Sequence, residues 1–296
     1  TKEVISMGKI RNLTICTKKI PRDMKLLIIS DIHASKEIGW ENLAAVKDMV
    51  NMDDINQIVI PGDIVNDVTT LRDQEFKEML KTNLTNITQG KPTVVSYGNH
   101  DLMTKNRNGF WAPGKKELLK ETLEELPHFH LVRAGKKINI DGLNYSACSP
   151  NFSYYENSQK SKKDRESTED YTQIFYSNYK EDLFDAAEFN IFLTHEPQSI
   201  IKLSEVKGAC IQPNTDMVVS GHMHNGLLPN LLQKFARNRG IISPQMQLFP
   251  KYAQGINEVE DTTFIINGPI NTRIETPFIN KIYGPNATVV TLKKTR

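Results

Sequence analysis

Short runs of apolar, β-branched residues alternate with helical patterns along most of the chain. Five runs have the length and composition of buried strands, and they cover residues 25–30, 57–60, 93–96, 190–194 and 217–220. Strand-like alternation returns near the C-terminus, at 262–266 and 287–292. Apolar positions at helical spacing predict two helices, one marked by Leu43, Val46 and Val50 and another by Leu118, Leu119, Leu123 and Leu126. This alternation predicts an α/β sheet with helices on its faces.

Two segments interrupt the pattern. Residues 151–180 are rich in Ser, Lys, Asn and Tyr and poor in aliphatic residues, which indicates a polar surface insertion. Residues 225–260 carry several Pro and Gly residues without a steady period, which predicts a long loop that forms a wall or lid of a binding site. The sequence contains no internal repeat. Its length favours a single domain that comprises residues 1–296.

Charge and cysteine content exclude several classes of protein. The 296 residues include 37 basic and 35 acidic side chains, so the formal charge is +2 and no basic stripe for bulk nucleic-acid binding is present. Three cysteines at unrelated spacing do not form a disulfide framework or a zinc knuckle. No apolar run is long enough to span a bilayer. The chain begins at Thr1, so we also consider an N-terminal anchor or export signal that lies outside this sequence.

Side chains of metal-binding type occur in five short blocks, S-D-I-H, P-G-D, G-N-H-D, T-H-E and G-H-M-H. The candidate ligands are Asp31, His33, Asp63, Asn99, His195, His222 and His224. Each block directly follows a predicted strand, and in open α/β sheets ligands bind outside the carboxyl ends of strands. We therefore expect five strand ends to bring these side chains together. Gly62, Gly98 and Gly221 are expected to let the backbone turn tightly there.

Hard carboxylate and amide oxygens mixed with imidazoles, without thiolates, suit a pair of divalent cations that activate a water molecule. Asp31 and His33 are two residues apart, so on an extended segment they would face the same way. His222 and His224 share this spacing, and Asp63 has two oxygens with which to bridge two cations.

His100 and Asp101 have a different expected role from the ligands. A histidine at the rim of such a site can donate a proton to the leaving alkoxide, and a following carboxylate can orient its imidazole. We therefore predict both residues to be catalytic. Taken alone, each carboxylate in these blocks could instead be a helix cap or turn residue, and a single histidine could be a structural polar group. The five blocks together, each at a strand end, favour the metal site.

In this order the five motifs resemble the calcineurin-like metallophosphoesterase superfamily, over residues 26–224. The resemblance implies a four-layer α/β/β/α sandwich with a dinuclear metal centre. By match to the family pattern, one cation would be held by Asp31, His33, Asp63 and His224. The other would be held by Asp63, Asn99, His195 and His222, with His100 as the catalytic histidine.

The segment Q-L-F-P-K-Y that precedes Gly255 is similar to bacterial YkuE/YaeI-type phosphohydrolases. These proteins often carry an N-terminal anchor or export signal, so the resemblance implies a bacterial protein at the membrane or cell envelope, or otherwise in the cytoplasm. Lys251 and Tyr252 become candidate contacts for a substrate phosphate or head group, with a packed loop anchor as the alternative. The subfamily reads G-H-T-H-G-G-Q, whereas Asn225 and Leu227 replace a glycine and the glutamine here.

The predicted function is therefore a metal-dependent phosphoester hydrolase, in particular a phosphodiesterase or pyrophosphohydrolase that acts on a small or lipid-linked phosphate. Two divalent cations are expected, with Mn²⁺ first and Fe, Zn²⁺ or Mg²⁺ as alternatives. The protein is expected to be a monomer. Two other functions remain open: an inactive interaction scaffold on the same fold, and a nuclease, against which the near-neutral charge argues.

Overall fold

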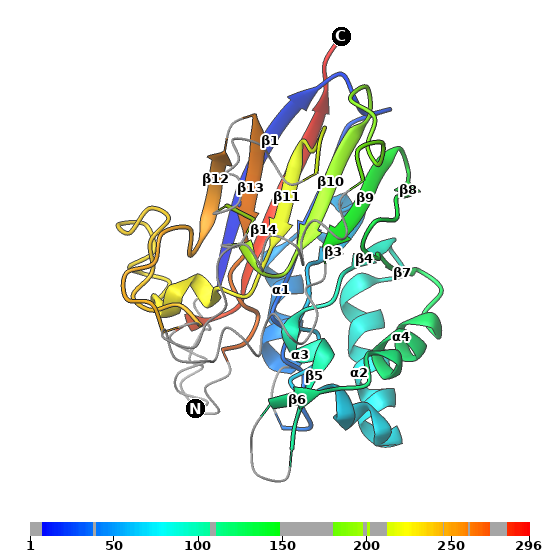
Figure 1. Ribbon diagram of the computed structural model, residues 1–296, viewed down its shortest axis with the longest axis vertical. Coiled ribbons are helices and arrows are strands. Elements are labelled where there is room, and N and C mark those ends of the chain that lie inside the picture. Colours follow the sequence, from blue (N-terminus) through cyan, green and yellow to red (C-terminus); the bar gives the residue numbers. More distant parts are fainter. Residues whose placement is uncertain are drawn as a thin grey trace.

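Two six-stranded sheets packed face to face form the body of the protein (Figure 1). The structure is a computed structural model. It describes residues 8–37, 40–106, 111–148, 180–197, 200–201, 212–244, 246–259, 261–272 and 283–296. The predicted polar insertion at 151–180 lies outside the described residues, except for its last position.

The first sheet combines strands from both ends of the chain. In spatial order it contains β1 (Lys9–Thr17), β14 (Asn286–Lys294), β2 (Met24–Ile28), β3 (Gln57–Ile60), β4 (Thr93–Val95) and β7 (Phe129–Leu131). β14 is antiparallel to β2, and every other neighbouring pair is parallel. β2, β3 and β4 therefore end at the same edge of this sheet.

The second sheet has a parallel centre and two antiparallel edges. In spatial order it contains β12 (Gly255–Val259), β13 (Thr262–Ile266), β11 (Met217–Ser220), β10 (Phe189–Thr194), β9 (Leu143–Cys148) and β8 (Ile138–Ile140). β12 and β8 are the antiparallel edge strands. β10 and β11 are parallel neighbours and end together.

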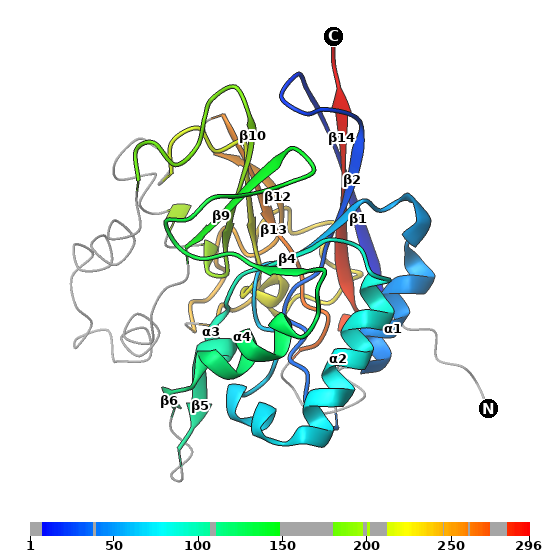
Figure 2. The same cartoon turned by 90° about the vertical axis from the view of Figure 1, so that its right-hand side faces the viewer.

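Successive side chains of β2 point to opposite faces of the sheet and so pack in different layers. Leu27 packs in a cluster with the helices, whereas Leu26 and Ile28 pack between the two sheets. The covering helices are α1 (Trp40–Met49), α2 (Gln74–Thr88) and α4 (Lys116–Glu124). Figure 2 shows α1 and α2 on the side of β2 and β14 that faces away from β9 and β10.

Helix α2 shows how local sequence sets these layers. The Asp73 carboxylate accepts the Phe76 backbone N–H at 3.1 Å, which satisfies a free donor of the first turn. Phe76, Leu80 and Leu84 then recur at i, i+4 and i+8, so one stripe of the helix is buried. The helix ends at Thr88, and Gln89 after it has a left-handed φ of 51°.

A third apolar cluster covers the outer face of the second sheet. Phe192, Val218 and Phe264 of the sheet pack there with residues that include Leu183 and Ile200. Two packed sheets, with helices outside the first and further residues outside the second, form the expected α/β sandwich. In the described part of the chain, no helix is both long and apolar enough to cross a bilayer.

The strand positions predicted from the sequence are confirmed, but two details differ. The pattern by itself predicted one sheet, whereas the structure divides the strands between two. The loop predicted at 225–260 also ends earlier than expected, because Gly255–Val259 form strand β12, which pairs with β13. The remaining short elements are α3 (Asn99–Leu102), the ribbon β5 (Met103–Lys105) and β6 (Trp111–Pro113), and the 3-10 turns Met52–Asp54, Val68–Arg72 and His224–Leu227.

Candidate metal centre

The carboxyl ends of five strands from both sheets meet at one place. Asp31, Asp63 and Asn99 follow β2, β3 and β4 of the first sheet. His195 and His222 follow β10 and β11 of the second sheet, whose arrowheads point toward α3 in Figure 1. The seven predicted ligands are therefore brought together by two sheets rather than by the crevice of one.

Three of these side chains form a first group around facing imidazoles. His33 Nε2 lies 3.1 Å from His224 Nε2. Asp31 Oδ1 lies 3.2 Å from His224 Nε2 and 3.9 Å from His33 Nε2. Ligand atoms of all three lie within 4.8 Å of one another, a spacing that suits a single cation between them.

A second group forms beside the first, and Asp63 lies between the two. Asp63 Oδ2 is 3.0 Å from His195 Nε2 and 3.6 Å from His33 Nε2, so one oxygen faces both groups. His222 completes the second group, and its Nδ1 lies 2.9 Å from Asn99 Oδ1. The Asp63 carboxylate thus lies between the two groups of side chains.

The hydrogen bonding of His195 fits a metal ligand. Its Nδ1 lies 2.8 Å from the Pro61 carbonyl oxygen, to which Nδ1–H donates, so that His195 presents a lone pair at Nε2 whenever the ring is neutral. That Nε2 is buried and has no hydrogen-bond partner, although Asp63 Oδ2 is 3.0 Å away. Two electron-rich atoms that face each other in a buried place are stable when a cation binds both.

Electrostatics in the cluster also favour a cation. Burial raises the pKa of Asp31, but His224 and His195 outweigh it, so the pKa falls below its ordinary value. Burial lowers the pKa of His195, but Asp63 and Asp31 outweigh it and raise the pKa to about 10. Burial, with repulsion from His195, lowers the pKa of His222 to about 3. Two buried carboxylates therefore require positive charge here, which protonated His195 or a divalent cation can supply.

The backbone at the site is left-handed at five of the seven predicted ligands. The φ angles are 52° at Asp31, 45° at His33, 55° at Asp63, 67° at His222 and 47° at His224. Non-glycine residues seldom adopt this conformation, and it concentrates at functional sites. The extended segment predicted for S-D-I-H is therefore wrong, although the two-residue spacing still sends both side chains to one site.

Two of the three glycines in the motifs differ from the expectation. Gly62 has a φ of 99°, so it does provide a turn that favours glycine. Gly98 and Gly221 instead provide space, because a Cβ on Gly98 would lie 2.2 Å from Asp63 Oδ1 and one on Gly221 would lie 2.5 Å from Asp31 Oδ2. The carboxylates of Asp63 and Asp31 therefore occupy the space that a side chain at these two positions would need.

Asp101 has a different role from the one predicted, because its carboxylate holds backbone rather than the His100 ring. Oδ2 accepts the N–H groups of Asp63 and Gly98, both at 2.8 Å, and Oδ1 accepts that of Ile64 at 3.0 Å. Burial and the charge of Asp63 raise the pKa of Asp101 to about 7. Asp101 thus positions the loop that carries Asp63, so we expect it to act through Asp63 rather than by orienting His100.

The His100 imidazole is oriented by Asn66 instead. Its Nδ1 lies 2.6 Å from the Asn66 carbonyl oxygen. The Trp111 ring packs edge-on against it at 4.8 Å between centroids. A ring nitrogen of His100 also lies within 4.8 Å of ligand atoms of His33 and Asp63. His100 therefore borders the ligand cluster, as predicted, while its role in catalysis stays a prediction.

Sequence reasoning missed Asn66, Trp111 and Glu196 near the site. Glu196 belongs to the T-H-E block, is buried, and has Oε2 3.7 Å from His222 Nε2. Its place inside a motif was the available signal. Asn66 acts through its backbone and Trp111 lies outside the motifs, so no sequence pattern marked either residue.

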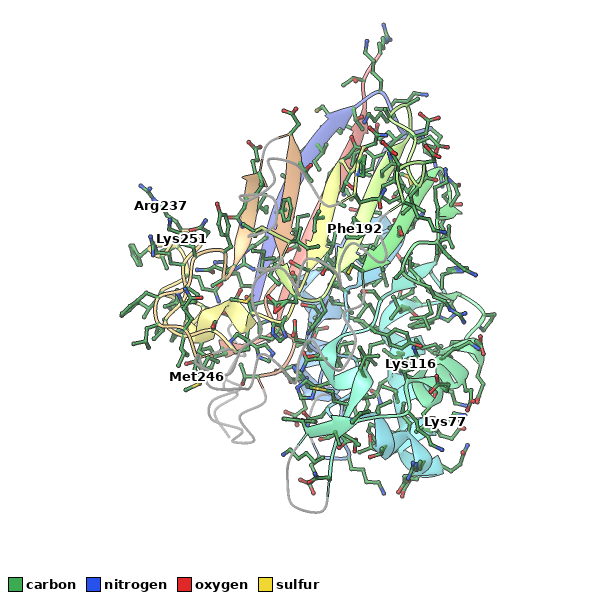
Figure 3. All side chains as sticks on the ribbon, in the orientation of Figure 1. Lys77, Lys116, Phe192, Arg237, Met246 and Lys251 are labelled. Atoms are coloured by element: carbon green, nitrogen blue, oxygen red, sulfur yellow. The ribbon has the colours of Figure 1, made fainter. Side chains whose placement is uncertain are left out.

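The predicted substrate contacts lie in the long loop after the second histidine pair. Lys251 is exposed at the edge of the molecule, on the same side as Arg237 (Figure 3). Tyr252 is partly buried against the third apolar cluster, which matches the loop-anchor alternative. Contact of either residue with a substrate stays a prediction.

Asn225, which replaces a glycine of the subfamily pattern, joins a buried polar cluster. Arg11 Nη2 donates to Asn225 Oδ1 at 3.2 Å, to Gln233 Oε1 at 2.9 Å and to Gln254 Oε1 at 3.1 Å. Burial lowers the pKa of Arg11 to about 10. This cluster attaches the loop after His224 to strand β1.

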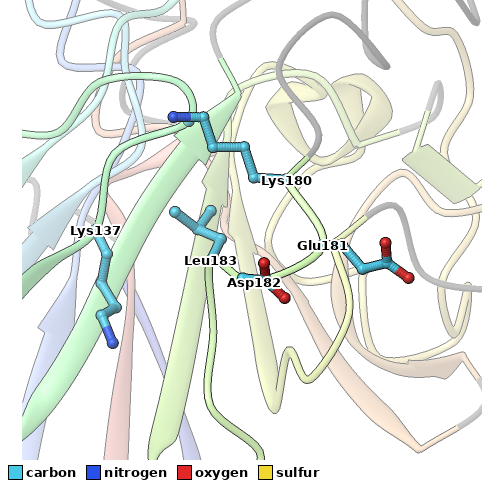
Figure 4. Close-up of a pocket in the computed structure, with 6 residues that line it drawn as sticks. Lys137, Lys180, Glu181, Asp182 and Leu183 are labelled. Carbon is cyan, nitrogen blue, oxygen red and sulfur yellow. The ribbon is translucent and has the colours of Figure 1, made fainter.

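A surface depression of about 520 Å³ lies elsewhere, before the start of β10. Lys137, Lys180, Glu181 and Asp182 are among its lining residues. Figure 4 shows the Lys180 and Glu181 side chains pointing in opposite directions. Charges of both signs that do not converge specify no ligand, so we assign no function to this depression.

Known proteins resemble this chain in sequence. The sequence profile of the calcineurin-like phosphoesterase family matches residues 24–226, more than half of the chain. Two uncharacterized metallophosphoesterases from two strains of Helicobacter pylori are each 21% identical to it, over 269 and 241 residues. These matches cover 86% and 79% of this chain but 60% and 54% of the relatives. The chain thus spans less than two thirds of the length of these relatives.

Solved structures also align with this fold. A dimetal phosphatase from Danio rerio matches 92% of this chain and 93% of its own, with a TM-score of 0.49 and 10% identity. A purple acid phosphatase from yellow lupin seeds matches 92% of this chain and 54% of its own, with a TM-score of 0.43 and 11% identity. Similarity of this degree carries no assignment of function.

Proposed function

The chain belongs to the calcineurin-like phosphoesterase family, and from that premise we propose that it is a phosphoester hydrolase that depends on two divalent cations. The observation that carries this proposal is the position of Asp63, whose Oδ2 faces His195 Nε2 at 3.0 Å and His33 Nε2 at 3.6 Å. A carboxylate oxygen between two sets of nitrogen and oxygen ligands is the arrangement that a two-metal hydrolase requires.

The ligands divide into two sets that share Asp63. Asp31, His33 and His224 would hold one cation, and Asn99, His195 and His222 the other. Two cations held in this way would polarise the phosphoryl oxygens and activate a water molecule. Mn²⁺ is our proposed cation, because mixed nitrogen and oxygen ligands suit it, and Fe, Zn²⁺ and Mg²⁺ are the alternatives.

His100 is the proposed proton donor for the leaving oxygen. Its Nδ1–H donates to the Asn66 carbonyl at 2.6 Å, so Nε2 is the nitrogen for proton transfer. Trp111 packs against the ring and limits its rotation. Asp101 contributes indirectly, because it holds the backbone N–H of Asp63 and thereby the position of the shared ligand.

We further propose a phosphodiester or a pyrophosphate, small or lipid-linked, as the substrate. This finer proposal rests on the sequence resemblance. The formal charge of +2 argues against a nucleic-acid substrate.

The test compares His222→Ala and His100→Gln in hydrolysis of a chromogenic phosphodiester by protein that has been stripped of metal and reloaded with Mn²⁺. We expect His222→Ala to lose bound metal and activity together. His100→Gln should keep its metal while kcat falls about 10²- to 10⁴-fold, the usual contribution of a general acid. His130→Ala on β7, outside the cluster, is the control and should match the unmodified protein.

Full activity in His222→Ala would overturn the proposal. Equal metal loss in both variants would make His100 a ligand rather than a proton donor. Activity toward a phosphomonoester but not toward diesters or pyrophosphates would reject the finer proposal and leave the coarser one standing.

A further inference from the structure

The large hydrophobic side chains that are exposed in the described part of the chain all lie on one segment. They are Leu231, Leu232, Phe235, Ile241, Met246, Leu248, Phe249 and Ile256. Phe235 is 74% exposed and Met246 is 75% exposed. Single exposed apolar residues are ordinary on soluble proteins, but a group of this size on one segment marks a docking surface. We call residues 228–256 the docking loop.

The docking loop carries charge of one sign. Its exposed charged side chains are Lys234, Arg237, Arg239 and Lys251. The sequence has no acidic residue between Asp216 and Glu258. Figure 3 shows Arg237, Met246 and Lys251 on one side of the molecule, opposite to Lys77 and Lys116. Basic and apolar side chains therefore share this surface.

Backbone contacts among the described residues of the loop define the conformation that exposes these side chains. Gly226 and Gly240 cross so closely that a Cβ on either would lie within 2.4 Å of the other's Cα. Ile241 N–H donates to the Gly226 carbonyl at 2.8 Å, and Phe249 N–H donates to the Ile241 carbonyl at 2.8 Å. Arg11 attaches the loop to β1 from the inner side. The docking surface is thus preformed.

We infer that the docking loop binds the surface of an anionic lipid bilayer. Aromatic and aliphatic side chains would enter the interface between head groups and acyl chains, and the four cationic side chains would bind lipid phosphates. A second copy of this chain is a poorer occupant, because its four basic side chains would face the four basic side chains of the first copy. The inference goes beyond the proposed function and does not depend on it, since binding to lipid needs no turnover.

The test is sedimentation of the full chain with vesicles of phosphatidylcholine, with and without phosphatidylglycerol. One double variant, Phe235→Ser with Phe249→Ser, removes apolar contact, and another, Arg237→Glu with Lys251→Glu, reverses charge. The matched control is Lys115→Glu with Lys116→Glu at the start of α4, where both lysines are exposed. All substitutions are at exposed positions, and circular dichroism verifies that each variant is folded.

We expect the protein to bind the anionic vesicles, and to bind them more weakly as salt increases. Each docking-loop variant should lower this binding about tenfold or more, whereas the control should not change it. Equal binding to neutral vesicles, or binding that the docking-loop variants leave unchanged, would overturn the inference. Sedimentation velocity provides a further test, because a dimer that the docking-loop variants dissociate would identify a second copy as the occupant instead.

Discussion

At the scale of single residues, the site depends on backbone that brings charged ligands unusually close to their neighbours. Asp31 and Asp63 both adopt left-handed φ angles, and each carboxylate packs where a neighbouring residue lacks a Cβ. The side-chain types in the motifs predicted which residues meet. They did not predict the conformation, because Asp and His adopt a left-handed φ more often than other non-glycine residues but still only in a minority of cases.

Substitution of Gly98 tests whether this position needs glycine for its small size or for its backbone conformation. Its φ of −101° and ψ of −179° are open to any residue, but a Cβ would lie 2.2 Å from Asp63 Oδ1. We expect Gly98→Ala to displace Asp63 and to weaken Mn²⁺ binding about 10- to 100-fold, the range seen when the support of a metal ligand is lost. Isothermal titration with Mn²⁺ measures this effect.

The matched control for this prediction is Gly90→Ala, on the turn after α2. Gly90 has a φ of 72°, and a Cβ added there would meet no other atom within 4 Å. Its substitution should cost about 1 kcal/mol of stability through backbone strain and leave Mn²⁺ binding unchanged. Unchanged Mn²⁺ binding in Gly98→Ala would show that the carboxylate does not need this space.

At the scale of elements, strands were predictable where apolar residues run without interruption, as at β3 and β11. β9 was missed although all six of its residues are buried. Asn144 interrupts its apolar run, and in the fold this polar side chain bonds to Asn190 of β10 at 3.0 Å. The hydrophobic pattern also did not predict that the strands divide into two sheets, because pairing between strands that are far apart in sequence produces no local periodicity.

The docking loop gives an element-scale prediction through Arg11. Arg11→Met removes the donor that holds Gln233 and Gln254, so the inner side of the loop loses its attachment to β1. We expect a stability loss of about 1.5–3 kcal/mol, the usual range for hydrogen bonds to a charged group. We also expect trypsin to cleave faster after Lys234, Arg237 and Arg239.

Limited proteolysis with mass spectrometry measures this effect, and Arg22→Met, an exposed arginine before β2, is the control. Cleavage of the loop at the same rate in Arg11→Met and in the control would contradict a role for Arg11 in holding it.

At the scale of the whole molecule, the site joins the two sheets. Asp31 and Asp63 come from the first sheet, whereas His195 and His222 come from the second. The predicted strand ends gave the set of residues that meet at this place, since each block follows a strand whichever sheet that strand belongs to. How the sheets face each other could not be read from the sequence, because it depends on the apolar cluster between them.

The most direct measurement of the central claim is the metal content of the protein after loading with Mn²⁺ and removal of free metal, determined by elemental mass spectrometry. If Asp63 bridges two sets of ligands, the unmodified chain should hold about two cations, and Asp63→Asn should hold fewer because both sets lose a ligand. A content below about one cation per chain in the unmodified protein, or an unchanged content in Asp63→Asn, would contradict the account.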